Sequence, residues 1–252
     1  MLQATQPVNN KYYLFENFPG SNLLSAFSMR DSGNMSLFYG DTGSVLGNRK
    51  NFFELLGIDY QDLICAKQVH AGAVRHIEES DKGSGALSCA NAIADTDALI
   101  TGKKNIPLSI FTADCLSIFL YDSKTRSIGL IHAGWRSSRE GIVSNTVRLM
   151  QEKFNTKARN LCAAFGPAIR DCCYEVGSDF SGFFPSGGLI NRGGRYYLDL
   201  AGINKSGLLA QGLQEKNIFD SGICTACHTE RFFSYRKEGA RCGRIMSVMM
   251  LR

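Results

Sequence analysis

An almost wholly apolar run from Pro107 to Tyr121 places the strongest constraint on the fold, because it predicts buried strands that carry Asp114-Cys115 in their midst. A buried strand has little reason to contain an acid and a thiol unless these groups meet a partner. Ser127 to Ile131 is again strand-like and leads directly into His132. Thiolate and imidazole are ligands that zinc prefers. The segment therefore predicts a buried sheet with a candidate metal site at the end of its strands.

Hydrophobic periodicity predicts that helices and strands mix without strict alternation. Helices are expected over Ser44–Leu56 and over Ser138–Phe154, where apolar residues repeat every 3.6 positions, and Asp199 is a plausible N-cap for a helix towards Leu213. The Gly-rich stretch from Phe184 to Arg195 is expected to be a surface excursion. Strands are expected at Leu63–His70, Ala98–Thr101, Leu108–Tyr121 in one or two pieces, Ser127–His132, Leu161–Phe165, Tyr196–Leu198 and Arg244–Leu251. The pattern predicts a single α+β domain with mixed sheets covered by helices.

The composition of the 252 residues is that of an ordinary globular protein, with 44% hydrophobic and 20% charged residues. The net charge of +5 is mild and the basic residues are scattered, so no nucleic-acid partner is expected. No window approaches the roughly 20 apolar residues that cross a bilayer, and no signal peptide is evident. We therefore expect a cytoplasmic protein without a membrane partner, whose nine cysteines are mostly reduced and buried.

Two of the four histidines, His70 and His132, stand where predicted strands open into Gly-containing turns. Together with Cys115 they could supply two nitrogens and a sulfur and leave a fourth position free, the pattern of catalytic zinc. The three residues lie 45 and 17 positions apart, so spacing alone does not join them. Two unrelated histidines and a buried thiol remain the alternative. Asp114 can share a site with Cys115 only if the strand ends or bulges there, since neighbours in a strand point to opposite faces.

A second cysteine motif, Cys224-Thr225-Ala226-Cys227-His228, matches the spacing of covalent haem attachment, but no export signal accompanies it. A structural zinc held by Cys224, Cys227, His228 and Cys242 is formally acceptable, and reduced cysteines are the simpler interpretation. The adjacent Cys172 and Cys173 are poorly placed for a mutual bridge and are expected to be structural.

Several basic residues could hold an anion, arginine being the better bidentate partner of phosphate. A position beside a Gly-containing turn favours Arg49, Lys67 and Arg136 over Arg30, Arg170 and Arg236.

Seven further motifs follow one another along the chain: Lys67-Gln68-Val69-His70, Asp95-Thr96-Asp97-Ala98-Leu99-Ile100-Thr101, Thr112-Ala113-Asp114-Cys115-Leu116, His132-Ala133-Gly134-Trp135-Arg136, Gly166-Pro167-Ala168-Ile169, Cys173-Tyr174-Glu175-Val176-Gly177 and Phe232-Phe233-Ser234-Tyr235-Arg236. This ordered set resembles the multicopper polyphenol oxidase (laccase-domain) family, whose members are described as zinc-dependent purine nucleoside phosphorylases with adenosine deaminase activity; one branch is the peptidoglycan editing factor. The resemblance covers about residues 27–252, so residues 1–26 are expected to be an N-terminal segment of the same domain.

The resemblance implies a four-layer α/β/β/α fold with one catalytic zinc ion on His70, Cys115 and His132. It also implies phosphorolysis of adenosine, inosine, guanosine and S-methyl-5'-thioadenosine, with phosphate as co-substrate, and deamination of adenosine to inosine. The family's upstream pattern falls on Asn34, Gly40-Asp41 and Asn48-Arg49, but the loop before it is shortened, since Arg30-Asp31-Ser32-Gly33 runs directly into Asn34.

Residue roles follow as hypotheses. Arg49 and Lys67 would clamp phosphate, Asp114 would contact base or ribose, and Asn34 and Arg136 would bind substrate. Copper is expected only adventitiously, because a multicopper oxidase needs on the order of ten histidines and the chain has four. The rival enzymatic hypothesis is cell-wall precursor editing, in which Cys115 or a zinc-bound hydroxide would cleave an amide. A metal-stabilised binding module is the non-enzymatic one.

Overall fold

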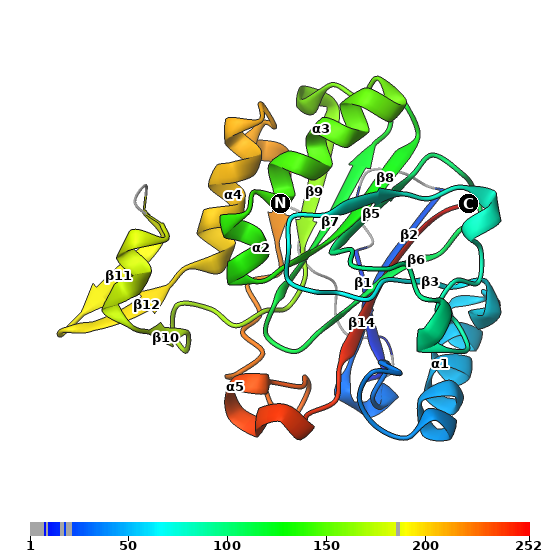
Figure 1. The fold of residues 1–252 in the computed structure, drawn as a ribbon, viewed down its shortest axis with the longest axis horizontal. Coiled ribbons are helices and arrows are strands. Elements are labelled where there is room, and N and C mark those ends of the chain that lie inside the picture. The colour runs from blue at the N-terminus through cyan, green and yellow to red at the C-terminus, as the bar shows by residue number, and fades with distance from the viewer. Residues whose placement is uncertain (1–7, 9, 16–17, 19–21, 185–186) are drawn as a thin grey trace.

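Two mixed β-sheets stack face to face and form the centre of the molecule (Figure 1). The computed structural model describes residues 8, 10–15, 18, 22–184 and 187–252. The first sheet has the order β1 (Tyr12–Leu14), β2 (Leu23–Ser28), β14 (Ile245–Leu251), β6 (Leu108–Thr112) and β3 (Ile64–Cys65). The second has the order β13 (Ile218–Asp220), β9 (Leu161–Phe165), β7 (Leu116–Asp122), β8 (Ser127–Ala133), β5 (Ala98–Thr101) and β4 (Val74–His76). Each sheet combines parallel and antiparallel pairs.

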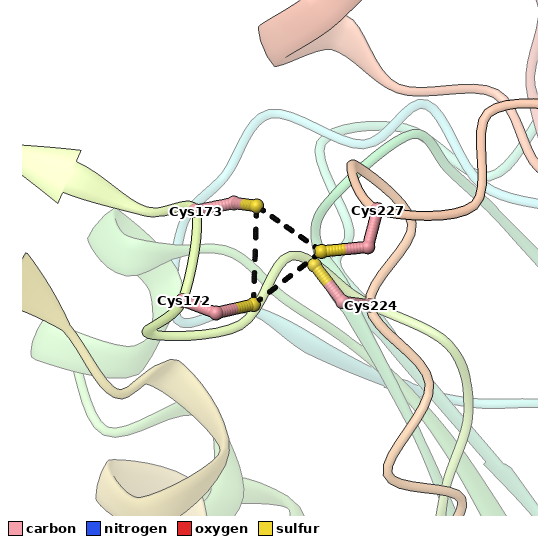
Figure 2. Close-up of side chains that lie close together, drawn as sticks. All are labelled: Cys172, Cys173, Cys224 and Cys227. Carbon is pink, nitrogen blue, oxygen red and sulfur yellow. Dashed lines mark hydrogen bonds between the residues drawn. The ribbon is translucent and has the colours of Figure 1, made fainter.

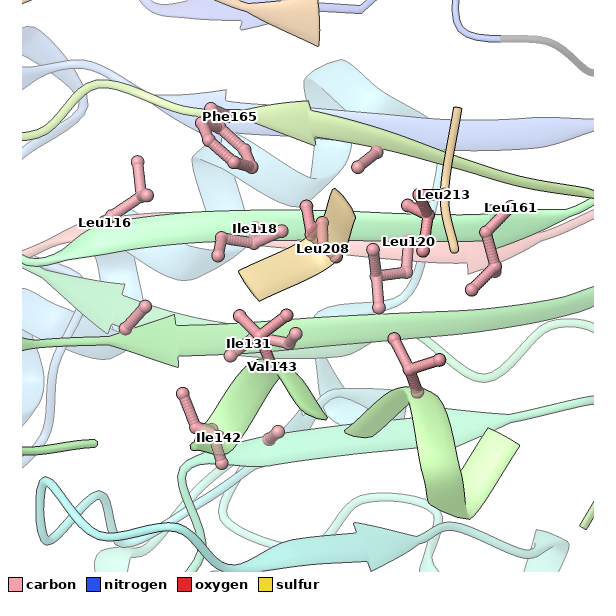
Figure 3. Close-up of a cluster of buried hydrophobic side chains, with 14 of the residues drawn as sticks. Leu116, Ile118, Leu120, Ile131, Ile142, Val143, Leu161, Phe165, Leu208 and Leu213 are labelled. Atoms are coloured by element: carbon pink, nitrogen blue, oxygen red, sulfur yellow. The ribbon is translucent and has the colours of Figure 1, made fainter. Parts of the chain in front are cut away.

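Helices cover the outer face of each sheet. α1 (Thr42–Leu56) buries Phe52, Phe53 and Leu56 against the first sheet. α3 (Ile142–Phe154) and α4 (Leu200–Ala210) pack on the second, where Val143 and Leu208 share one buried cluster with the strand residues Ile118 and Ile131 (Figure 3). A third cluster fills the space between the sheets and includes Ile110, Met249, Phe119 and Leu130. The α+β fold with four α/β/β/α layers and mixed sheets in one domain is confirmed, and strands buried on both faces explain the continuous apolar runs.

The Pro107–Tyr121 run divides into two strands that belong to different sheets. β6 ends at Thr112, and the chain crosses through Ala113-Asp114-Cys115 before β7 begins at Leu116. Asp114 has a φ of +87°, which turns the backbone out of the strand conformation. Asp114 and Cys115 therefore lie at the opening between the two sheets, outside any regular ladder.

Local interactions correct several predicted boundaries. α1 begins at Thr42 because the Asp41 carboxylate accepts from the Ser44 amide. The helix expected over Ser138–Phe154 is wrong at its start, because Gly141, with a φ of +73°, separates α2 (Trp135–Arg139) from α3. The strand expected over Leu63–His70 ends at Cys65. Asp199 is confirmed as the N-cap of α4, which ends at Ala210 rather than near Leu213.

Several short elements were not predicted, because so few residues carry too little periodicity. The strand predicted at Tyr196–Leu198 is the exception in this part of the chain. A small sheet of β10 (Glu175–Val176), β12 (Arg195–Leu198) and β11 (Leu189–Arg192) projects from the side of the molecule (Figure 1). It includes much of the predicted surface excursion. α5 (Tyr235–Glu238) lies near the end of the chain. Across the described residues, no helix is both long and apolar enough to cross a membrane.

Candidate metal centre and active-site cavity

The β7–β8 hairpin brings Cys115 and His132 together. Leu116 pairs with Ala133, so the residue before β7 faces the end of β8. His70 arrives from the loop that precedes β4, whose neighbour β5 pairs with β8. The ligand atoms of His70, Cys115 and His132 all lie within 4.8 Å of one another, and the two imidazole rings are 4.7 Å apart between centroids. The topology thus joins three residues that sequence spacing could not join.

Asp97, just before β5, holds His70 and His132 in place through hydrogen bonds. Its carboxylate is fully buried and accepts from His132 Nδ1 at 2.7 Å. It also accepts from the three successive amides of Val69, His70 and Ala71 at 2.8–3.1 Å. These contacts hold His70 in a left-handed conformation, with a φ of +61°. A carboxylate on one imidazole nitrogen fixes the ring and leaves the other nitrogen for a metal.

Both the packing and the donor chemistry fit a transition-metal ion. A Cβ added to Gly134, between β8 and α2, would stand 3.0 Å from the His70 ring and 3.1 Å from the Cys115 sulfur, so a larger residue there would crowd the two ligands. Two imidazoles and one thiolate, with a carboxylate behind one imidazole, form a ligand set suited to zinc. The neighbouring Phe111 and Trp135 line the surrounding cavity.

Cys115 and His132 form a charged pair in the absence of metal. Burial raises the pKa of the Cys115 thiol, but the neighbouring His132 and His70 outweigh this effect and lower the pKa to about 6. Burial lowers the pKa of His132, but the Cys115 thiolate and the Asp97 carboxylate outweigh it and raise the pKa to about 9. Between these values the pair is thiolate and imidazolium.

Zinc binding at about pH 7.5 should release about one proton. The Cys115 pKa of about 6 means that the thiol is already ionised, whereas the His132 pKa of about 9 means that its imidazolium must lose a proton before it can bind metal. Zinc affinity should therefore fall about tenfold per pH unit as the pH falls from about 9 to 6. Isothermal titration calorimetry in two buffers of different ionisation enthalpy measures this release. A value near zero would contradict the charged pair.

His70, Cys115 and His132 line part of a cavity of about 870 Å³, a size typical of small-molecule sites. Its wall is strongly aromatic and carries both cations and carboxylates. The aromatic residues are Phe38, Tyr39, Phe111, Trp135, Tyr174, Phe180 and Tyr235. The charged residues are Lys67, Asp114, Arg136, Glu175, Arg236 and Arg244.

Three predicted substrate residues lie in this wall. Lys67 and Arg136 are exposed, and the Arg136 guanidinium lies 4.4 Å from the centroid of the Trp135 ring. Asp114 accepts from the Thr225 hydroxyl and from the Arg236 amide, both at 2.6 Å. Its carboxylate is therefore held in a fixed orientation at the cavity wall, one residue before Cys115.

The other two predicted substrate residues have structural positions, and neither lines the cavity. Arg49 is only 1% exposed, and its guanidinium donates to the carbonyls of Met35, Gly85 and Ala86. The phosphate-clamp hypothesis for Arg49 is therefore corrected, because these donors are already engaged. Asn34 accepts from the Ser36 and Arg244 amides and donates to carbonyls through its side-chain nitrogen, so it joins its own loop to the start of β14.

An Arg49→Ala variant should lose stability rather than phosphate affinity. Loss of the guanidinium leaves three carbonyls without their donor and opens a cavity beneath α1, which should cost about 3–5 kcal/mol. Chemical denaturation measures the free energy of unfolding. A matched Lys50→Ala change on the same helix is exposed and should cost under about 1 kcal/mol. A stable Arg49→Ala protein with a raised phosphate KM would restore the clamp.

Sequence reasoning assigned no role to Asp97, Gln68 and Tyr174. Gln68 fastens the His70 loop to β6 through paired hydrogen bonds with the Phe111 backbone. Burial, followed by the nearby Cys115, raises the pKa of Tyr174 well above its usual range, so its phenol stays neutral. A buried acid immediately before the apolar Ala98–Thr101 strand was the available signal for Asp97.

The second cysteine motif lies beside other residues than those predicted. The predicted ligand set of Cys224, Cys227, His228 and Cys242 is wrong. Cys224 and Cys227 lie beside Cys172 and Cys173 instead, and neither His228 nor Cys242 belongs to this group. His228 Nδ1 instead lies 3.2 Å from a Glu230 carboxylate oxygen. The Cys242 sulfur accepts from Arg244.

Comparison with known proteins places this geometry in context. Residues 25–252 match the family model described as multi-copper polyphenol oxidoreductase laccase. Purine nucleoside phosphorylase YlmD of Geobacillus stearothermophilus is 33% identical over 225 residues, which cover 86% of this chain and 82% of that protein. Adenosine deaminase RL5, from an unknown prokaryotic organism, is 32% identical over 220 residues, 84% of each chain.

Solved structures share the fold over nearly the full length. The crystal structure of YlmD from Geobacillus stearothermophilus superposes with a TM-score of 0.95 at 28% identity and covers 99% of both chains. The Bacillus licheniformis hypothetical protein YfiH gives a TM-score of 0.92 at 27% identity, covering 96% of this chain and 97% of that one.

Proposed function

The chain belongs to the multi-copper polyphenol oxidoreductase laccase family, and we propose that it is a zinc-dependent purine nucleoside phosphorylase that also deaminates adenosine to inosine. The substrates of phosphorolysis would be adenosine, inosine, guanosine and S-methyl-5'-thioadenosine. The observation that carries the proposal is the convergence of His70, Cys115 and His132 at an aromatic cavity of about 870 Å³. Relatives named purine nucleoside phosphorylase and adenosine deaminase support the substrate class.

The proposed metal is a single zinc ion on His70, Cys115 and His132, which when bound supplies Lewis acidity to the purine. Asp97 keeps the His132 ring oriented, and the Cys115 thiolate supplies the negative charge that a dication needs. An oxidase with several copper ions is not supported by the remaining histidines. His76 lies beside Glu78 and His228 beside Glu230, and neither lines the cavity.

Phosphate is proposed to bind between Lys67 and Arg136. Both are exposed cations at the cavity wall, and the flat guanidinium of Arg136 suits two phosphate oxygens at once. In phosphorolysis, a phosphate oxygen forms a bond with C1′ of the ribose while the C1′–N9 bond breaks and its electron pair leaves with the base. The two cations hold the nucleophile against C1′, which converts a collision into a positioned reaction.

The nucleoside itself is proposed to lie on the aromatic wall. Tyr235 is an exposed aromatic residue of this wall and can contact the face of a purine, whose stacking on an aromatic ring contributes about 1–3 kcal/mol. Asp114, held by Thr225 and Arg236, offers carboxylate oxygens to a ribose hydroxyl or a purine N–H. Tyr174 also lines the cavity as a neutral phenol and can donate a hydrogen bond to the base; burial raises its pKa further from neutrality.

Zinc-loaded protein given inosine and phosphate should release hypoxanthine and ribose 1-phosphate. Lys67→Met should raise the phosphate KM by about 10–100-fold, because a charge-assisted contact contributes about 1.5–3 kcal/mol. Chromatography of the bases at varied phosphate measures both effects, and the exposed Lys153 on α3 provides the control Lys153→Met. An unchanged phosphate KM would reject Lys67. No hypoxanthine from the wild-type protein would reject the phosphorylase.

A further inference from the structure

Four cysteine sulfurs converge at a place separate from the cavity, where two loops meet (Figure 2). Cys172 and Cys173 lie in the loop after β9, and Cys224 and Cys227 lie between β13 and α5. All four sulfurs are within 4.8 Å of one another. Three of the six separations are 3.8 Å for Cys172–Cys173, 3.7 Å for Cys172–Cys227 and 3.4 Å for Cys173–Cys227.

We propose that these four cysteines hold a second, structural zinc ion as a tetrathiolate centre. In a tetrahedron of sulfurs around zinc, a Zn–S distance of about 2.3 Å places neighbouring sulfurs about 3.8 Å apart. The three separations of 3.4–3.8 Å are close to this value. A disulfide would need about 2.05 Å. Four sulfurs with no harder donor in the group favour zinc over magnesium or calcium.

Backbone hydrogen bonds join the two loops that carry the four cysteines. An isolated parallel bridge joins Ala168 to Cys224, with Thr225 N donating to Ala168 O at 3.1 Å and Ala168 N donating to Ile223 O at 3.2 Å. The Cys224 sulfur accepts from the backbone N–H groups of Arg170 and Cys227. Amide donors to sulfur are the kind of outer contact that supports a metal-bound thiolate.

The four-cysteine centre lies next to two segments of the cavity wall. One loop continues from Cys173 to Tyr174, and the other carries Thr225, whose hydroxyl donates to Asp114. A metal at the junction would therefore fasten two parts of the cavity wall to each other. Its role would be to hold that wall, while the chemistry takes place at Cys115.

Metal content and coordination test the proposal directly. Wild-type protein purified with zinc should contain about two zinc ions per chain by mass spectrometry, and a Cys115→Ala/His132→Ala variant should retain one. X-ray absorption of that variant should show a shell of sulfur alone at about 2.3 Å. Cys173→Ser/Cys227→Ser should lose one ion and leave a mixed nitrogen and sulfur shell. The exposed Cys89 lies outside the cluster and provides the control Cys89→Ser, which should keep both.

Retention of no zinc by the Cys115→Ala/His132→Ala variant would overturn the proposal, as would a nitrogen or oxygen shell around the retained ion. Thiol titration that finds these four cysteines oxidised, without metal, would also overturn it. The X-ray absorption spectrum is recorded on the Cys115→Ala/His132→Ala variant, in which the four cysteines are intact. The test therefore remains valid even if Cys173→Ser/Cys227→Ser does not fold. The active-site zinc and the nucleoside activity of the wild-type protein are measured separately, so either proposal can fail without the other.

Discussion

Replacement of Cys115 by alanine should remove one zinc ion per chain and lower kcat/KM for purine nucleosides by on the order of 10³-fold or more. The thiolate is the one anionic donor among the three residues that meet at the cavity, so the remaining two imidazoles cannot balance the charge of a dication. The change removes a partly exposed side chain at the crossing between β6 and β7, so the fold should survive. Zinc content and nucleoside turnover on the same sample measure the effect.

Cys89→Ala is the matched control for this change, because Cys89 is an exposed cysteine outside both metal-ligand groups. It should retain full zinc content and activity. A Cys115→Ala protein that keeps its zinc, or that turns over nucleosides within about tenfold of wild type, would show that the chemistry lies elsewhere.

Asp97→Asn should weaken both the fold and the metal centre. The buried carboxylate accepts from four donors, three backbone amides and His132 Nδ1, and an amide side chain would direct its own N–H groups at some of them. Loss of such a buried charged acceptor should cost about 3–5 kcal/mol of unfolding free energy. Zinc affinity should fall by about 10–100-fold because His132 loses its orienting partner. Denaturant titration and competition with a chelator measure the two effects.

The neighbouring Asp95 provides the control for Asp97. It is exposed and has a φ of +44°, a conformation that asparagine tolerates well, so Asp95→Asn should change stability by less than about 0.5 kcal/mol. Equal losses in the two variants would mean that the loop tolerates neither change, and that the hydrogen bonds of Asp97 are not the cause.

The layers of the fold could be predicted where strands are long and buried on both faces. The apolar runs at 98–101, 127–132 and 161–165 form strands with nearly the predicted bounds. A strand buried on both faces has few positions for polar residues, so its sequence is a continuous apolar run. Short strands such as β4 and β13 could not be predicted, since three residues carry no measurable period. The crossing at Asp114 depends on a left-handed turn, and the apolar pattern continues across it.

The residues of the candidate metal centre could be predicted from their types, but the contacts among them could not. His70, Cys115 and His132 stood out because polar ligands at strand ends are unusual, yet only the register of β7 against β8 explains why two of them meet. Arg49 misled the prediction because an arginine beside a glycine suggests an anion site. In the fold, the same side chain serves as a buried donor to three carbonyls. Cys172 and Cys173 were set aside as a pair, because their partners lie some fifty residues away.

Chromatographic analysis of adenosine incubated with zinc-loaded protein, with and without phosphate, tests the central claim most directly. Adenine should form only when phosphate is present, inosine should form whether or not it is present, and the Cys115→Ala variant should form neither product. No turnover of adenosine, inosine or S-methyl-5'-thioadenosine by fully zinc-loaded wild-type protein would contradict it, and so would products that persist undiminished in the Cys115→Ala variant.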